Sequence, residues 1–257
     1  MATRAERALS FGSIAPVYDR LRPPPVAEAV DWLVPDGCEV AVDVAAGTGL
    51  FTRPLAERVA RVVAVEPDPK MRNVLADRSP GVEVLEGTGE SIPMPDASAD
   101  AVFVSSAWHW LDPARALTEM ARVLRDGGRL GVLWTSRDRD VEWVRALDRL
   151  PGEPPWDGES EGRHRRNRDV DLAMVDGELF GQVERMSFST SRPMRIDEIV
   201  ELAGTYSAVI TAAPDVRAVV LDNARAALHR RFPGTDVVEF PIRSWCWRAD
   251  RLARDRN

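Results

Sequence analysis

The chain has 257 residues, of which 44% are hydrophobic and 29% are charged, so it can bury the core of one large globular domain. Its formal net charge of −7 repels phosphate backbones and argues against nucleic acid as a partner. Two cysteines, Cys38 and Cys246, are too few for a disulfide framework, and neither a secretory signal nor a membrane-spanning apolar run is recognisable, so we expect a cytoplasmic protein without a membrane partner.

Short apolar runs alternate with helical patterns between residues 38 and 135. Apolar runs without polar alternation are typical of strands buried on both faces, so we expect a parallel sheet with helices on both sides. The predicted strands are Val40–Val44, Arg61–Val65, Val82–Leu85, Ala101–Val104 and Arg129–Trp134. The predicted helices are Leu50–Val59, Met71–Asp77 after an Asp68-Pro69 start, and a helix that runs from Asp112-Pro113 through Leu124 and is ended by Gly127-Gly128.

The pattern becomes less regular after Trp134. The later predicted elements are a helix at Val141–Leu150, a loop at Pro151–Asn167, strands at Val183–Thr190 and Val237–Trp247, and helices between them at Ile196–Leu202 and Asp215–Phe232. We therefore expect a single domain over 1–257, with an N-terminal helical lid (1–37), a core (38–135), a partly helical cap with a late strand (136–236), and a final strand and tail (237–257).

A glycine-rich turn, Asp43-Val44-Ala45-Ala46-Gly47-Thr48-Gly49, follows the first predicted strand. Glycines at the carboxyl end of a parallel strand let a ligand approach the backbone closely. Glu66 ends the second strand, where a carboxylate can accept both hydroxyls of a ribose. A dinucleotide is disfavoured because Thr52 replaces the third glycine of its binding turn and Asp43 would repel a pyrophosphate. An aminoacyl group with a sulfonium would not be repelled, so the turn favours S-adenosylmethionine.

Five segments in sequence resemble the motifs of class I S-adenosylmethionine-dependent methyltransferases. They are Val42–Gly49, Val63–Asp68, Glu86–Pro95, Ala99–Val104 with Ala107–Trp110, and Ala121–Leu130. The resemblance covers about residues 10 to 135 and is closest to the small-molecule branch, that of the methyltransferase type 11 and trans-aconitate methyltransferase-like enzymes. It implies an α/β fold with a Rossmann-like, seven-stranded, mostly parallel sheet, an N-terminal helical lid, and a partly helical cap inserted between late strands.

The resemblance also implies a site for S-adenosyl-L-methionine, with S-adenosyl-L-homocysteine as the product. Asp43, Gly47 and Gly49 would hold the methionine part of the cofactor, and Glu66 its ribose hydroxyls. Tyr18 and Arg22 would fold over the cofactor, with Arg22 near the methionine carboxylate. The other residues expected to bind the cofactor are Ala45, Pro67, Thr88, Gly89, Glu90 and Ser105.

The acceptor site is expected beyond the fourth strand. His109 is the candidate general base or substrate-orienting residue, because methyl transfer by in-line displacement needs alignment above all and a base only if the nucleophile must lose a proton. Trp108 and Trp110 flank it and would line an apolar acceptor pocket. After the fifth strand, Trp134 and Arg137 are placed to reach the same cleft, Arg137 as a candidate for a substrate carboxylate. The three histidines lack metal-ligand spacing, so no metal site is expected.

Three functions remain open. The first is methyl transfer from S-adenosylmethionine to a small-molecule acceptor. The second is a nicotinamide-dependent oxidoreductase, which is disfavoured because the only lysine, Lys70, is not part of a Tyr-x-x-x-Lys pair. The third is a protein that binds S-adenosylmethionine without catalysis. Neither the acceptor nor the oligomeric state is indicated by any motif.

Overall fold

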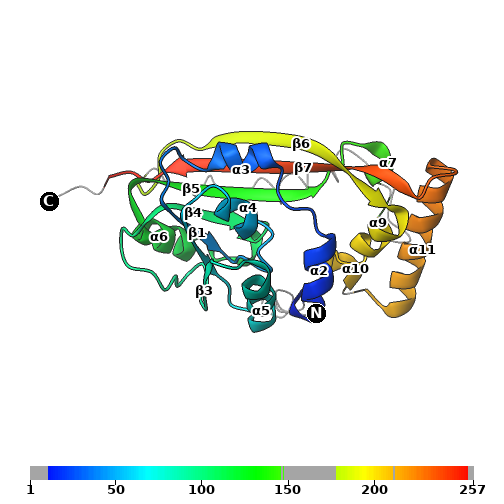
Figure 1. The fold of residues 1–257 in the computed structure, drawn as a ribbon, viewed down its shortest axis with the longest axis horizontal. Coiled ribbons are helices and arrows are strands. Elements are labelled where there is room, and N and C mark those ends of the chain that lie inside the picture. Colours follow the sequence, from blue (N-terminus) through cyan, green and yellow to red (C-terminus); the bar gives the residue numbers. More distant parts are fainter. Residues whose placement is uncertain (1–10, 146, 148–177, 211, 254–257) are drawn as a thin grey trace.

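The computed structural model describes residues 11–145, 147, 178–210 and 212–253 (Figure 1). Its centre is a seven-stranded sheet in the order β3-β2-β1-β4-β5-β7-β6. The strands are β1 (Val40–Val44), β2 (Arg61–Val65), β3 (Glu83–Leu85), β4 (Ala99–Ser105), β5 (Leu124–Arg137), β6 (Glu184–Arg195) and β7 (Val237–Asp250). Neighbours from β3 to β5 pair in parallel, and β7 runs antiparallel to both β5 and β6. The α/β class and the mostly parallel sheet are confirmed.

Apolar side chains pack on both faces of the sheet. Along β1, Val42 and Val44 belong to the apolar layer that includes α6 (Pro113–Val123). Ala41 belongs to the layer on the other face, with α3 (Ala27–Leu33), α4 (Thr52–Ala56), α9 (Ile196–Ala203) and α11 (Pro214–Arg231). This alternation explains why the strand reads as a continuous apolar run. The helices are η1 (Phe11–Ile14), α2 (Ala15–Leu21), α3 (Ala27–Leu33), α4 (Thr52–Ala56), α5 (Pro69–Arg78), η2 (Trp108–Trp110), α6 (Pro113–Val123), α7 (Glu142–Arg145), α9 (Ile196–Ala203), α10 (Ser207–Ile210) and α11 (Pro214–Arg231).

Two helices begin at the Asp-Pro pairs that the sequence singles out. The Asp68 carboxylate accepts hydrogen bonds from the backbone N–H groups of Lys70 and Met71 at the start of α5. The Asp112 carboxylate accepts one from the N–H of Arg115 at the start of α6. An aspartate cap satisfies donors that the first helical turn leaves unpaired, and the following proline has no N–H to satisfy.

The Gly127-Gly128 pair does not end α6, which corrects the sequence prediction. The helix ends at Val123, and β5 begins at the next residue, Leu124. The register between β4 and β5 then shifts, because Ala99 pairs with Leu124 while Ala101 pairs with Arg129. Gly127, with φ of +75°, lies within this irregularity, where a left-handed backbone accommodates the extra residues.

Strand β5 is longer than predicted and extends beyond β4. The pairing with β4 stops where Ser105 meets Leu133. The last four residues, Trp134 to Arg137, form ladder pairs with β7 alone. Figure 1 shows β5, β7 and β6 as the long strands that reach toward α9 and α11. One edge of the end of β5 is therefore available to line a space beyond β4.

The later part of the chain follows the predicted order with longer strands. Helices α9, α10 and α11 lie between β6 and β7 in the chain, which confirms a helical insertion between late strands, although α10 was not predicted. The predicted helix at Val141–Leu150 is described only in part, as α7, and the predicted loop Pro151–Asn167 lies outside the described residues. In the part of the chain that is described, no helix is both long and apolar enough to cross a membrane.

The close packing of β5 on β4 predicts the effect of one substitution. Gly131 pairs with Phe103, and a Cβ on Gly131 would lie 2.5 Å from Phe103 Cδ1 and 3.1 Å from Leu33 Cδ2. Gly131→Ala should therefore lower the free energy of unfolding by about 1–3 kcal/mol, as overpacking does in a close-packed core. Urea unfolding measures this loss. Gly181→Ala is the matched control, because its Cβ would come no closer than 3.6 Å, and equal stability losses would contradict the packing argument.

Candidate active site

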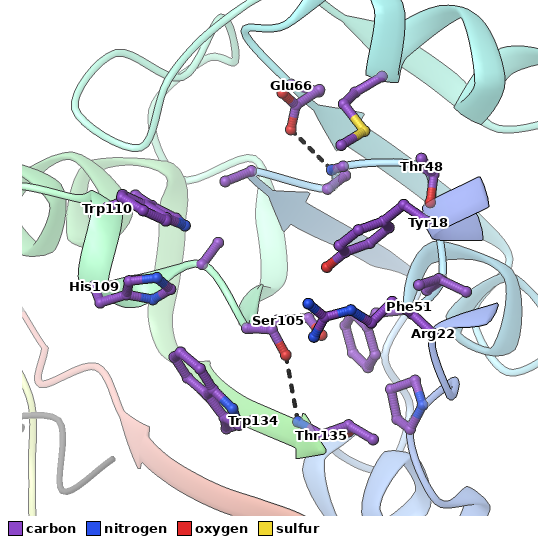
Figure 2. A pocket seen from close by; sticks show the side chains of 18 of the residues that line it. Tyr18, Arg22, Thr48, Phe51, Glu66, Ser105, His109, Trp110, Trp134 and Thr135 are labelled. Atoms are coloured by element: carbon purple, nitrogen blue, oxygen red, sulfur yellow. Dashed lines mark hydrogen bonds between the residues drawn. The ribbon is translucent and has the colours of Figure 1, made fainter. Parts of the chain in front are cut away.

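A cavity of about 810 Å³ lies at the carboxyl ends of the parallel strands (Figure 2). Its walls come from the turns after β1 and β2, the loop after β3, the ends of β4 and β5, and helix α2. Ligands of open parallel sheets bind at this position. The predicted site residues that line it are Tyr18, Arg22, Ala45, Gly47, Glu66, Pro67, Thr88, Gly89, Glu90, Ser105, His109, Trp110 and Arg137.

Glu66 holds two neighbouring strand ends together. One carboxylate oxygen accepts a hydrogen bond from the N–H of Gly47 and the other from the N–H of Asp68, each at 2.8 Å. The side chain is buried, and burial raises the pKa of Glu66 although both hydrogen bonds oppose the shift. A carboxylate offers about four acceptor positions, so two hydroxyl groups of a ligand can still bind to Glu66.

Three residues of the turn after β1 have a left-handed backbone conformation. Ala45, Gly47 and Gly49 have φ of 53°, 60° and 85°. Gly49 does not line the cavity, and its role in holding the cofactor stays a prediction. A Cβ at this residue would lie 3.0 Å from the Ser79 hydroxyl, so Gly49 lets the turn pack against α5. Thr48 lines the cavity, and its buried hydroxyl has no partner among the described residues, as expected of a group that can bind a ligand.

Asp43 lies beneath this turn rather than in the cavity. It is completely buried, and one oxygen accepts a hydrogen bond from the Thr52 hydroxyl at 2.6 Å. Asp43 thus ties β1 to the start of α4, and its second oxygen has no hydrogen-bond partner among the described residues. That Asp43 holds the methionine part of the cofactor stays a prediction. Burial raises the pKa of Asp43 to about 7; the Thr52 hydroxyl opposes the shift and the Glu66 charge adds to it.

Helix α2 is fastened over the cavity at two points. Arg53 donates hydrogen bonds to the Asp19 carboxylate at 2.8 Å and to the Thr48 carbonyl at 2.9 Å, which joins α2 to the glycine turn. Arg22, at the end of α2, donates to the hydroxyl and the carbonyl of Thr205 at 3.1 and 2.9 Å. Figure 2 shows Tyr18 and the Arg22 guanidinium extending into the cavity from this side.

Three aromatic rings form the facing wall. The His109 ring centroid lies 4.3 Å from that of Trp110 and 4.8 Å from that of Trp134 (Figure 2). Trp108 does not line the cavity but lies in the hydrophobic core, which corrects its prediction as a substrate-binding residue. The reason is that η2 has about three residues per turn, so its consecutive side chains point in different directions. Trp134 lines the cavity as predicted.

Several residues that line the cavity were not predicted. Ala46, Thr48 and Asp68 lie within recognised motifs, whereas Arg139 and Tyr206 belong to the less regular second half of the chain. The lining residues that were not predicted are Pro23, Pro25, Ala46, Thr48, Leu50, Phe51, Asp68, Met71, Ser106, Ala107, Leu111, Thr135, Ser136, Arg139 and Tyr206. Within the described ranges, no group of three or more His, Cys, Asp or Glu side chains is arranged to hold a metal ion.

This geometry defines a ligand pocket at the carboxyl ends of parallel strands, and comparisons with known proteins identify the family of the chain. Residues 42–132 match the family model described as a methyltransferase domain. An uncharacterized methyltransferase of Mycobacterium tuberculosis is 40% identical over 96% of this chain and 98% of its own. A malonyl-[acyl-carrier protein] O-methyltransferase of Hahella chejuensis is 31% identical over 78% of this chain and 73% of its own.

A solved structure agrees with this assignment. A protein of Anaeromyxobacter dehalogenans, provisionally assigned as a type II methyltransferase, superposes with a TM-score of 0.66 and 26% identity, over 91% of this chain and 99% of that one. The chain belongs to the class I S-adenosylmethionine-dependent methyltransferases, and S-adenosylmethionine is its cofactor. This membership rules against the nicotinamide-dependent alternative.

The buried carboxylate of Asp43 predicts how stability depends on pH. Its pKa is about 7 in the folded protein and near 3.8 in the unfolded chain, so between these values the folded state binds more protons. Its contribution to stability is therefore fully present below pH 3.8 and is lost as the pH rises toward 7. Relative to Asp43→Asn, which cannot titrate, the free energy of unfolding should fall by at most about 1.4 kcal/mol per pH unit in this window.

Urea unfolding of both proteins between pH 5 and 8, roughly spanning the upper part of this window, measures the difference. In the difference between the two unfolding free energies, the contribution of every other group that titrates alike in both proteins cancels. Parallel stability curves for the two proteins would contradict the prediction.

Proposed function

We propose that this chain transfers the methyl group of S-adenosylmethionine to a small-molecule acceptor by in-line displacement. The supporting observation is that one cavity of about 810 Å³ combines a carboxylate-and-glycine end with an aromatic and cationic end. Two reactants bound side by side in one cavity can be held in the geometry for attack, and this alignment is the main requirement of the reaction. Bound S-adenosylmethionine supplies a methyl group on a sulfonium.

The residues at the first end fit an adenosyl group. Glu66 has acceptor positions left for the two ribose hydroxyls, and Pro67 follows it in the wall. Thr88, Gly89 and Glu90 would lie along the adenine. A Cβ on Gly89 would lie 2.8 Å from Leu111 Cδ2, so a side chain at this position would displace Leu111 in the cavity wall. The remaining cofactor contacts in the proposal are the Arg22 guanidinium with the methionine carboxylate, and the backbone of Ala45, Gly47 and Ser105, with Tyr18 closing over them.

The residues at the second end fit an acceptor. The His109 ring packs against the rings of Trp110 and Trp134 in the cavity wall. If the nucleophile is a hydroxyl, its oxygen forms a bond to the methyl carbon, the carbon–sulfur bond breaks, and the proton passes to a nitrogen of His109. If the nucleophile carries no proton, His109 orients the acceptor.

The ribose assignment predicts the effect of removing the Glu66 carboxylate. Glu66→Ala should weaken S-adenosylhomocysteine binding about 10- to 100-fold, the loss expected for hydrogen bonds to a charged group. Titration calorimetry measures the dissociation constant. Glu83→Ala is the control, because Glu83 is an exposed carboxylate on β3 that pairs with Arg61. Unchanged binding by Glu66→Ala would refute the ribose assignment, and a wild-type protein that does not bind the compound would refute the function.

The proposed role of His109 predicts a kinetic effect. Mass spectrometry of cell extract incubated with the protein and methyl-labelled S-adenosylmethionine should reveal a labelled small molecule. With that acceptor, His109→Gln should lower kcat about a hundredfold or more if His109 is the base, and should remove the acidic limb of the pH profile. A smaller loss with an unchanged profile would assign it to orientation. His229→Gln is the control, because the His229 side chain is exposed on α11.

The same incubation separates catalysis from binding alone. A wild-type protein that binds S-adenosylhomocysteine yet labels no molecule would support the alternative of a non-catalytic S-adenosylmethionine-binding protein.

A further inference from the structure

The turn that would lie along the adenine is closed by its own hydrogen bonds. The N–H groups of Thr88 and Ser91 each donate to the carbonyl of the other residue, at 3.1 and 3.2 Å. The Thr88 hydroxyl accepts a further hydrogen bond from the N–H of Glu90 at 3.3 Å. Thr88, Gly89 and Glu90 line the cavity. A turn of this size is at best marginally stable by itself, so contacts from outside must hold its conformation.

Two side chains of α6 bind the backbone that follows this turn. The Glu119 carboxylate accepts a hydrogen bond from the N–H of Ile92 at 2.7 Å. The Arg122 guanidinium donates to the carbonyl of Ile92 at 2.9 Å and to the carbonyl of Met94 at 2.8 Å. Both polar groups of the Ile92 backbone are thus bound by one helix. Because the Ile92 side chain is also buried in the core, this residue is a fixed point from which the turn extends.

The two α6 side chains also hold each other. Glu119 and Arg122 are three residues apart and so lie on one face of the helix. The Nε and Nη2 groups of Arg122 each donate to one oxygen of the Glu119 carboxylate at 2.8 Å, and Nη1 donates to Asp96 at 2.7 Å. Such paired hydrogen bonds fix the plane of a guanidinium. The hydrogen bonds from Arg122 lower the pKa of Glu119 more than burial raises it, so the pair stays charged at neutral pH.

Further contacts set where the turn lies. The Glu90 carboxylate accepts a hydrogen bond at 2.7 Å from the N–H of Asp112, the residue before α6. A Cβ on Gly87 would lie 2.7 Å from Pro93 Cδ and 2.8 Å from Val65 Cγ1, so the base of the turn packs closely against β2. The turn is therefore placed between β2 and α6.

Glu119 and Arg122 do not line the cavity, so they can affect a ligand there only through the turn. We propose that these two side chains are positioning residues for the cofactor: they hold residues 88–90 in the form that receives the adenine before the cofactor arrives. A site formed in advance binds with its full affinity, whereas a site formed about a tenth of the time binds about tenfold more weakly. This inference rests on the proposed function, which assigns the turn to the adenine.

Substitutions of Arg122 test the proposal on the full-length protein. Arg122→Met keeps an unbranched apolar stem but removes the donors to the carbonyls of Ile92 and Met94. Titration calorimetry should show S-adenosylhomocysteine binding weakened about tenfold or more. Arg122→Lys keeps the charge but loses the planar fork, so its affinity should fall between the two proteins. Arg115→Met is the matched control, because it removes an exposed guanidinium from the same helix, and it should bind like the wild type.

Amide hydrogen exchange distinguishes positioning of the turn from a general loss of stability. In ligand-free Arg122→Met, the N–H groups of Thr88 and Ser91 should exchange nearly as fast as in an unfolded chain, whereas in the wild type they should be protected. The N–H of Val42, in the central strand β1, should stay protected in both proteins. Saturating S-adenosylhomocysteine should restore slow exchange in the turn of the variant, because the bound adenine selects the formed turn.

The outcomes are distinct. Equal S-adenosylhomocysteine affinity in Arg122→Met and the wild type, or turn amides that exchange alike in the two ligand-free proteins, would each overturn the proposal. The core variant Gly131→Ala should bind like the wild type; an equal loss of binding there would assign the effect to stability and also overturn it. If Arg122→Met does not fold, Arg122→Lys and Glu119→Gln decide the question, since each should weaken binding several-fold.

A failure of the wild-type protein to bind S-adenosylhomocysteine would instead overturn the proposed function.

Discussion

The hydrogen bonds that the Glu66 carboxylate accepts from Gly47 and Asp68 are the interactions on which the rest of the site depends. The parallel pairing of Val44 with Val65 brings the ends of β1 and β2 side by side, and Glu66 fixes the turns that follow them. A buried carboxylate is stable only with such donors, so the turn and the charge require one another. Two further side chains extend this unit. Asp43, below the turn, accepts a hydrogen bond from Thr52 at the start of α4, and Arg53 joins the turn to α2.

The first five strands and much of the cofactor end could be predicted because their signals are local. A run of apolar residues, a glycine pair and an Asp-Pro helix start each lie within a few residues of one another, and parallel topology places them at one edge. The pattern does not separate residues that touch the ligand from residues that support the turn. Gly47 lines the cavity whereas Asp43 and Gly49 lie beneath it, although all three stand in one motif.

The acceptor end could be predicted only in part because its residues meet through distant contacts. Tyr206 reaches the cavity because the segment between β6 and β7 packs against α2, a contact that joins Arg22 to Thr205 across the chain. Trp108 lies in the core and Trp110 lines the cavity because one tight helical turn points their side chains in different directions. The amino-acid composition does not reveal these directions. The start of β5 was misjudged for a similar reason, since Gly127 serves a bulge rather than a helix end.

The extension of β5 beyond β4 places part of the cavity wall outside the ladder between these two strands. The family match ends at residue 132, and the wall formed by β5 begins at Trp134. The ladder between β4 and β5 ends before that wall, because from Trp134 onward the strand forms ladder pairs with β7 alone. Under the proposed function, redesign of the substrate range would therefore concentrate on the end of β5 and on Tyr206.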